Sequence, residues 1–175
     1  MIGRVMHVVL GLGGNLGDPE SAFREALEAL ATAGEMIAVS RLWRTRPVGP
    51  EQPDYLNAAA VVAWPTGPRS LLERCRELEI AAGRVRSSEE RWGPRVLDLD
   101  LLLAEDIVCR GPVLALPHPR FHERRFALEP TAEVAAAWVH PLLGITVSQL
   151  ADRKRVQEPE AILEVRDFEF SILNF

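Results

Sequence analysis

The chain has 175 residues, a length that one domain with a hydrophobic core can fill. Apolar residues make up 47% and charged residues 26%, which are the proportions of an ordinary soluble globular protein. The net charge of −5 argues against a general nucleic-acid binder, and no apolar run is long enough to predict a membrane span.

The first half of the chain carries alternating strand and helix signals. Asp18 is predicted to cap a helix that starts at Pro19, because an aspartate followed by proline is a common helix start. Glycines at 34 and 83 are predicted to end helices. The expected elements are a strand at 4–12, a helix from 19 to 34, a strand at 35–45, a strand at 55–64 and a helix at 69–82.

The run GLGGNLGD at 11–18 contains four glycines but fits neither common nucleotide-binding loop. The dinucleotide fingerprint would need glycine where Leu16 stands, and the phosphate-loop motif would need a Gly-Lys-Ser/Thr ending. We interpret the run as a tight strand-to-helix turn in which the glycines relieve backbone strain.

The second half of the chain is less regular. Its expected elements are a strand DLDLLL from Asp98, a short strand around Ile107 and Val108, a helix at 131–138, a helical turn at 146–152 and a strand within 161–173. The core order β-α-β-β-α-β predicts an α+β fold of the ferredoxin-like kind, an antiparallel sheet with two helices on one face. We expect the other face, or the sheet edge, to stay open for a ligand beneath long loops.

Asp98 and Asp100 are the most informative residues of the chain. In a strand they project from one face, about 7 Å apart at a rise of about 3.3 Å per residue, while Leu97, Leu99, Leu101 and Leu103 face the core. Two carboxylates without a nearby His or Cys favour Mg²⁺ over zinc, because Mg²⁺ prefers oxygen ligands and shares its shell with water and phosphate. The same pattern is also typical of the wet face of an antiparallel sheet, whose acids pair with nearby arginines.

Arginines are clustered along the chain. Of the 20 basic residues all but Lys154 are Arg, and they gather at 41–46, 84–95 and 120–125. Arginine presents a planar fork of donors suited to phosphate, although a genome-wide base bias would give the same excess. In a chain of negative net charge, local clusters favour a small anionic ligand over a long polyanion. Beside the Asp pair, they indicate a site for a polyphosphate bound with Mg²⁺.

Other side chains near these clusters could contact a flat heterocycle. Tyr55 and Asn57 share one strand face, and the Asn57 amide offers a donor and an acceptor together. Trp92 and Phe126 could stack on a ring, or could equally be satellite core residues. His118 has no acidic partner at metal-ligand spacing, and we interpret it as a polar contact.

Cys75 and Cys109 are far apart and belong to no CxxC pair. The sequence therefore predicts neither a disulfide framework nor a zinc site, and both residues are expected to be small buried side chains. No secretory leader pattern is recognisable. Together these features predict a reduced, cytoplasmic protein.

These residues stand in blocks that resemble the 6-hydroxymethyl-7,8-dihydropterin pyrophosphokinase family over roughly residues 5–150. The most specific block, RWGPRxLDLDLL, lies at residues 91–102 without a mismatch. The flanking blocks follow in family order: GxNLGD, TxPVGPxQPDYLNA, ELExxxGRxR and LPHPRxHERxFxLxP.

The resemblance implies transfer of the β,γ-diphosphate of ATP, as one unit, to the pterin hydroxymethyl group, with release of AMP. It implies that Asp98 and Asp100 bind two Mg²⁺ ions and that Arg84 and Arg95 steady the transferred group. The implied nucleotide contacts are Glu79, Arg86, Arg91, His118 and Arg124. The implied pterin contacts are Thr45, Pro47, Val48, Tyr55 and Asn57, with the ring stacked between Trp92 and Phe126.

The chain departs from the family pattern at three places. Arg76 stands where many relatives have an uncharged residue, and Arg125 where a small residue is common. The segment 86–91 is one residue longer than in some relatives. The loops 45–54 and 84–94 are expected to act as lids that exclude water.

The resemblance assigns residues 1–152 to a pyrophosphokinase domain and leaves 153–175 as a C-terminal extension that adds an edge strand or makes a dimer contact. We expect ATP and 6-hydroxymethyl-7,8-dihydropterin as partners, no nucleic acid or membrane, and a monomer, with a dimer as the alternative. Two other functions are kept open: a module that binds a nucleotide or RNA without chemistry, and a Mg²⁺-dependent kinase that transfers only the γ-phosphate.

Overall fold

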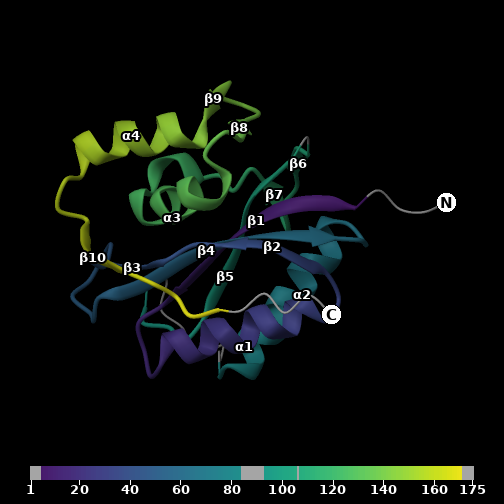
Figure 1. Ribbon diagram of the computed structural model, residues 1–175, viewed down its shortest axis with the longest axis horizontal. Coiled ribbons are helices and arrows are strands. Elements are labelled where there is room, and N and C mark those ends of the chain that lie inside the picture. Colours follow the sequence, from purple (N-terminus) through teal and green to yellow (C-terminus); the bar gives the residue numbers. More distant parts are fainter. Residues whose placement is uncertain (1–4, 84–92, 106, 171–175) are drawn as a thin grey trace.

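A six-stranded antiparallel sheet forms the centre of the protein (Figure 1). The structure, a computed structural model, describes residues 5–83, 93–105 and 107–170. The strands lie in the order β10-β3-β4-β1-β5, and β2 pairs with β4 beside β3. Their bounds are β1 Met6–Gly14, β2 Glu35–Val39, β3 Leu42–Thr45, β4 Tyr55–Trp64, β5 Asp98–Ala104 and β10 Ile162–Arg166.

Helices cover both faces of this sheet (Figure 1). On one face lie α1 (Pro19–Ala31) and α2 (Pro68–Ala81), and on the other lie α3 (Arg125–Ala135) and α4 (Val147–Gln157). The remaining elements are the pair β6 (Cys109–Arg110) and β7 (Ala115–Leu116), a 3₁₀ turn at Phe121–Glu123, and the pair β8 (Val139–His140) and β9 (Ile145–Thr146). The α+β class with helices on an antiparallel sheet is thereby confirmed. The core order is β-α-β-β-β-α-β, because the strand predicted at 35–45 is two strands, β2 and β3. Within the described residues, no helix is both long and apolar enough to span a membrane.

Of the two alternatives expected for ligand access, the open sheet face is wrong, because α3 and α4 pack on it, and the open sheet edge is not contradicted. The sequence placed a helix at 131–138, whereas α3 begins at Arg125 and contains Pro130 inside it. A proline interrupts only one backbone hydrogen bond, and the surrounding core holds the turn that lacks it: Leu128 and Thr131 are fully buried. The predicted turn at 146–152 is in fact longer, since α4 continues to Gln157 behind a capping box of Thr146 and Gln149.

The smaller expectations were confirmed in part. The strand predicted at 35–45 is interrupted at Ser40, whose hydroxyl accepts a hydrogen bond from the Ala59 amide at 2.9 Å. The short strand expected at 107 and 108 lies at Cys109–Arg110. Cys75 is buried as expected, but Cys109 is only half-buried. The Asp18 cap is confirmed, because its carboxylate accepts from the Ser21 amide at 3.1 Å.

The two sheet faces carry two hydrophobic cores, and β5 changes face along its length. Leu97, Leu99 and Leu101 pack in the core between the sheet and the helices α1 and α2. Leu103, expected on the same face, packs instead with α3 and α4. A register shift between Val9 and Leu10 of the neighbouring strand leaves an extra residue in β5, and such a bulge reverses the alternation that follows it.

Only residues 15–18 of the glycine run form the predicted turn between β1 and α1, since Gly11, Gly13 and Gly14 belong to β1. A Cβ atom on Gly11 would lie 2.9 Å from Cδ1 of Leu102, and one on Gly14 would lie 2.4 Å from the Val96 carbonyl oxygen. Only Gly17 of the run has a positive φ, of 64°. The strand glycines therefore permit close approach of neighbouring chain segments.

The C-terminal part of the described chain returns to the sheet. After α4, β10 pairs with β3 and becomes the sheet edge, with Ile162 opposite Thr45. The boundary predicted at residue 152 falls inside α4. The division into 1–152 and 153–175 stays a prediction.

Gly14→Ala is expected to lower the free energy of unfolding by about 1–3 kcal/mol, because the added methyl meets a backbone carbonyl that cannot rotate away. Gly111→Ala is the matched control, since its Cβ atom would meet its nearest neighbour at an ordinary 3.4 Å. Urea unfolding of both variants measures the difference. Equal stability of the two variants would contradict the close approach at Gly14.

Candidate active site

A cavity of about 1110 Å³ opens above the ends of β1, β4 and β5 and continues around the β5 edge to α2. Its walls come from the chain after β3, from the β6–β7 hairpin and from the start of α3. The lining includes most of the described residues predicted from the sequence: Thr45, Val48, Tyr55, Asn57, Glu79, Arg95, Asp98, Asp100, His118, Arg124 and Phe126. A smaller cavity of about 510 Å³, between the β4–α2 turn and the β6–β7 hairpin, is lined by none of them.

The floor of the large cavity is a row of paired residues across three strands. Gly13 of β1 pairs with Asn57 on one side and with Asp98 on the other. Gly11 pairs with Asp100 in the next row on the same face. Because Gly13 carries no side chain, the Asn57 amide and the two carboxylates border a recess there, whereas the Leu102 side chain packs over Gly11.

The two carboxylates lie on one face, as the alternation predicted, and each has an arginine beside it. Nη1 of Arg95 is 2.9 Å from Oδ2 of Asp98, and Nη1 of Arg124 is 3.8 Å from Oδ2 of Asp100. Burial, and then the charge of Asp98, raises the pKa of Asp100 well above its usual value, against the opposing effect of Arg124. The raised pKa means that the buried site disfavours the charged form of Asp100 beside Asp98, and a bound cation would offset that repulsion.

Glu79 reaches this region from α2, on the opposite side of β5. Its side chain is only 3% exposed, and Oε1 accepts a hydrogen bond from the Leu99 amide at 2.9 Å. Leu99 lies between the two aspartates, so Glu79 fixes the strand that carries them. Glu79 therefore positions Asp98 and Asp100 indirectly, by holding the β5 backbone between them from the α2 side.

On the β3–β4 side, the polar groups are bonded to one another. Nδ2 of Asn57 donates to the Thr45 hydroxyl at 2.8 Å, so one of the amide donors is already committed. The Tyr55 hydroxyl donates to the Gly93 carbonyl at 3.1 Å. Val48 lines the cavity with an exposed side chain, whereas Pro47 is half-buried and does not line it.

His118 is neutral in this structure at physiological pH. Burial, with the nearby charge of Arg124, lowers the pKa of His118 to about 4. Nδ1 accepts a hydrogen bond from the Arg120 amide at 3.1 Å, so a neutral ring carries its proton on Nε2. His118 is thus arranged as a hydrogen-bond donor that adds no charge.

Arg124 and Phe126 form the wall at the start of α3. The Arg124 guanidinium carbon is 5.6 Å from the centre of the Phe126 ring. An arginine and an aromatic ring side by side offer both a phosphate contact and a stacking surface. The other predicted site residues, Arg84, Arg86, Arg91 and Trp92, lie outside the described residues.

Asn15 is a residue for which the sequence predicted no role. Its side chain is almost fully buried: Oδ1 accepts from the Arg95 amide at 2.8 Å, and Nδ2 donates to the Gln52 side chain at 3.1 Å and to the Pro53 carbonyl at 3.0 Å. Asn15 therefore joins the loop before β4 to the backbone of Arg95, which contacts Asp98. Its place inside the glycine run was the available signal, since an amide there can satisfy several backbone groups.

Comparisons with known proteins agree with the resemblance. The family model for 7,8-dihydro-6-hydroxymethylpterin-pyrophosphokinase (HPPK) matches residues 9–136. The 2-amino-4-hydroxy-6-hydroxymethyldihydropteridine pyrophosphokinase of Synechocystis is 40% identical over 147 residues, covering 83% of this chain and 74% of the relative. The proteins of the same name from Haemophilus influenzae and Methylorubrum extorquens are 34% and 45% identical, over 85% and 72% of this chain and 95% and 80% of theirs.

Solved structures share the fold at low sequence identity. The chain matches wild-type Plasmodium falciparum HPPK-DHPS with pteroate at a TM-score of 0.70 and 13% identity, over 90% of its length. This chain spans 46% of that longer chain. A second structure of the Plasmodium protein, the A437G variant with SDX-DHP, matches at a TM-score of 0.70 and 14% identity, over 90% of this chain and 47% of the other.

Asn15→Ala is expected to lower the free energy of unfolding by about 1–3 kcal/mol, because it leaves buried backbone groups without partners. Hydrogen exchange should become faster at the Arg95 amide. Asn15→Asp is the matched variant: it keeps an acceptor for that amide but loses the donor to Gln52 and Pro53. Unchanged protection of Arg95 in the alanine variant would remove Asn15 as its anchor.

Proposed function

Because the chain belongs to the 7,8-dihydro-6-hydroxymethylpterin-pyrophosphokinase family, we propose that it transfers the β,γ-diphosphate of ATP to the hydroxymethyl group of 6-hydroxymethyl-7,8-dihydropterin, releasing AMP, in folate biosynthesis. The observation that carries the proposal is the pair of carboxylates beside a glycine-floored recess. The same recess has a polar amide on its other side and an aromatic ring in its wall.

The residues present fit Mg²⁺ bound together with a polyphosphate. Among the described residues, no three His, Cys, Asp or Glu side chains gather as a metal site. Asp98 and Asp100 would hold the ions, two of them by the resemblance, with phosphate and water completing the shells, as Mg²⁺ commonly requires. Bound there, Mg²⁺ would neutralise phosphate charge and make the substrate hydroxyl easier to deprotonate.

The chain's own side chains would orient the two substrates. Arg95 and Arg124 lie beside the carboxylates, where their guanidinium groups would be available to contact phosphate oxygens. The Nε2 proton of His118 provides a neutral donor to the same group. Such transfer depends on positioning and charge stabilisation more than on a strong protein base, and either Asp98 or Asp100 can accept the proton of the hydroxyl.

The acceptor would lie on the β3–β4 side. Asn57 presents its amide toward the recess, with Thr45 holding its orientation, and Phe126 provides a face for the pterin ring. Gly13 would then lie between a heterocycle subsite beside Asn57 and a phosphate subsite beside Asp98. Glu79 would act from behind β5, and Arg76 adds a positive charge to the nucleotide side.

³¹P NMR of the purified protein with Mg-ATP and 6-hydroxymethyl-7,8-dihydropterin tests the reaction. We expect AMP and a pterin diphosphate to appear together. ADP with a pterin monophosphate would mean attack at the γ-phosphate and a different kinase. An intact nucleotide in folded protein would favour a binding module without chemistry. A cytoplasmic location and a monomeric state remain predictions from the sequence.

Asp100→Asn is expected to abolish turnover while making the protein more stable at neutral pH. The pKa of Asp100 is raised in the folded protein, so its charged form disfavours folding, and stability is lost as pH rises from the unfolded pKa through the folded one. The stability difference should therefore be largest above the folded pKa and vanish in acid. Urea unfolding across pH measures it, with Glu105→Gln at an exposed carboxylate as control. Retained turnover would remove the metal-ligand assignment.

A further inference from the structure

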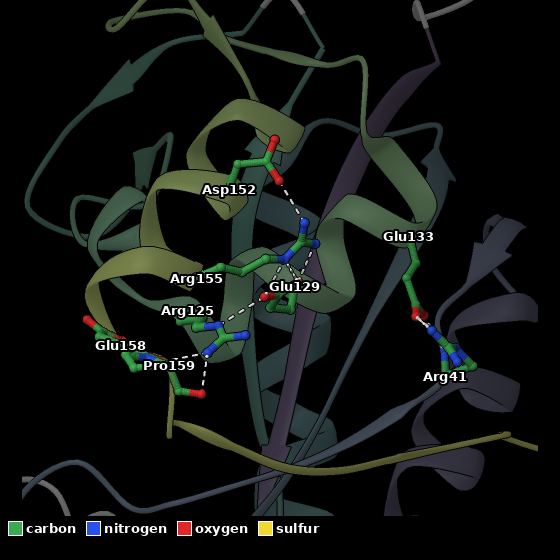
Figure 2. A network of polar contacts seen from close by, with 8 residues as sticks. All are labelled: Arg41, Arg125, Glu129, Glu133, Asp152, Arg155, Glu158 and Pro159. Atoms are coloured by element: carbon green, nitrogen blue, oxygen red, sulfur yellow. Dashed lines mark hydrogen bonds and ion pairs between the residues drawn. The ribbon is translucent and has the colours of Figure 1, made fainter.

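Arg125 lies between two cavity residues, Arg124 and Phe126, yet does not line the cavity itself, and its side chain points toward Glu129 and Pro159 (Figure 2). Its Nε donates to Oε1 of Glu129 at 2.9 Å, and its Nη1 donates to the carbonyls of Glu158 and Pro159. The side chain thus joins the first turn of α3 to the segment that follows α4. A small residue at this position could not make the connection.

The acid at the centre of this network is deeply buried. The Glu129 side chain is only 1% exposed, and its other partner is Arg155 of α4, whose Nη2 is 2.6 Å from Oε2 (Figure 2). Burial alone would raise the pKa of Glu129, but hydrogen bonds from Arg155 and Arg125 outweigh it and lower the pKa. A carboxylate held charged between two guanidinium groups fixes the position of both arginines.

The segment that Arg125 holds also contacts the opposite wall of the cavity. We call residues 158–162 the strap. The Ala161 carbonyl accepts a hydrogen bond from the Arg46 amide at 3.1 Å, and Ile162 pairs with Thr45 in the sheet. Glu158, the first residue of the strap, itself lines the cavity.

The attachment to that wall is reinforced one residue earlier in β3. Nε of Arg44 is 3.1 Å from Oε2 of Glu164 in β10, and Nη1 of the same side chain is 3.1 Å from Oδ2 of Asp54. The start of the loop 46–54 is therefore tied to the strap through Arg46, and its end contacts Arg44, whose side chain also contacts Glu164 of β10. Movement of the strap would move the loop.

We propose that the strap is a positioning element of the heterocycle subsite and that Arg125 is the residue that sets it. The strap connects the α3 wall, which carries Phe126, to the β3 wall, which carries Thr45. Its position therefore determines the width between the stacking ring and the Thr45–Asn57 pair. The inference rests on the proposed function, because it assigns the pterin acceptor to this side of the cavity and the nucleotide to the other.

Arg125→Ala tests the proposal, and Arg155→Ala is the matched control. Each change removes one of the two guanidinium partners of Glu129, but only the first also removes the hydrogen bonds to the Glu158 and Pro159 carbonyls of the strap. We expect KM for the pterin to rise about fivefold in Arg125→Ala, with kcat and KM for ATP within about twofold of wild type. Arg155→Ala should keep all three kinetic constants near their wild-type values, while its melting temperature falls by about as much as that of Arg125→Ala.

Arg125→Lys separates positioning from stability if the alanine variant folds poorly. Lysine keeps a positive charge near Glu129 but lacks the planar fork that reaches a carboxylate and a carbonyl together. We expect its melting temperature to stay near that of wild type while KM for the pterin still rises. An unchanged KM for the pterin in both Arg125 variants, or an equal change in Arg155→Ala, would overturn the proposal.

Hydrogen exchange at the Arg46 amide provides a readout that does not depend on turnover. The amide should exchange faster in Arg125→Ala than in Arg155→Ala or wild type, because its acceptor Ala161 lies in the released strap. Equal exchange in the three proteins would overturn the link between the walls. If wild type forms no AMP, the proposed function fails, while the exchange comparison still decides whether Arg125 holds the strap.

Discussion

The close approach that glycine allows along β1 is the constraint on which the rest of the site depends. β1 lies between β4 and β5 and is the only strand that pairs with both in the described chain. The side chain of Leu102 occupies the space above Gly11, and the Val96 carbonyl lies where a Cβ atom of Gly14 would be. Larger residues at these positions would separate the strands or push the entry to β5 away from the sheet.

The recess follows from the same constraint. With Gly13 between them, Asn57 and Asp98 lie in one row across three strands, separated by a strand that adds no side chain. The sheet thus sets the spacing between an amide and a pair of carboxylates with the precision of its hydrogen-bond register. Loops then need only close the sides, and Asn15 connects one of these loops to the backbone of Arg95.

The sequence predicted the structure correctly wherever a residue type has one strong local preference. The alternation around Asp98 and Asp100 predicted their common face, and the Asp18-Pro19 pair located the start of α1. It failed where distant contacts override the local signal. Nothing local indicates that Pro130 is tolerated inside a helix, or that a bulge turns Leu103 to the other core. The partners of Asn15 lie about 40 and 80 positions along the chain, so their meeting depends on the folded sheet.

The pairing of β10 with β3 has a consequence for how the protein is made. Arg44 and Glu164, which face each other across this pair, are 120 positions apart. Contacts so distant form late, because a long loop must close before they can stabilise anything. On the ribosome, the wall around Thr45 therefore remains without its outer strand until residues 162–166 have emerged. A nascent chain that has not yet reached β10 lacks that side of the cavity.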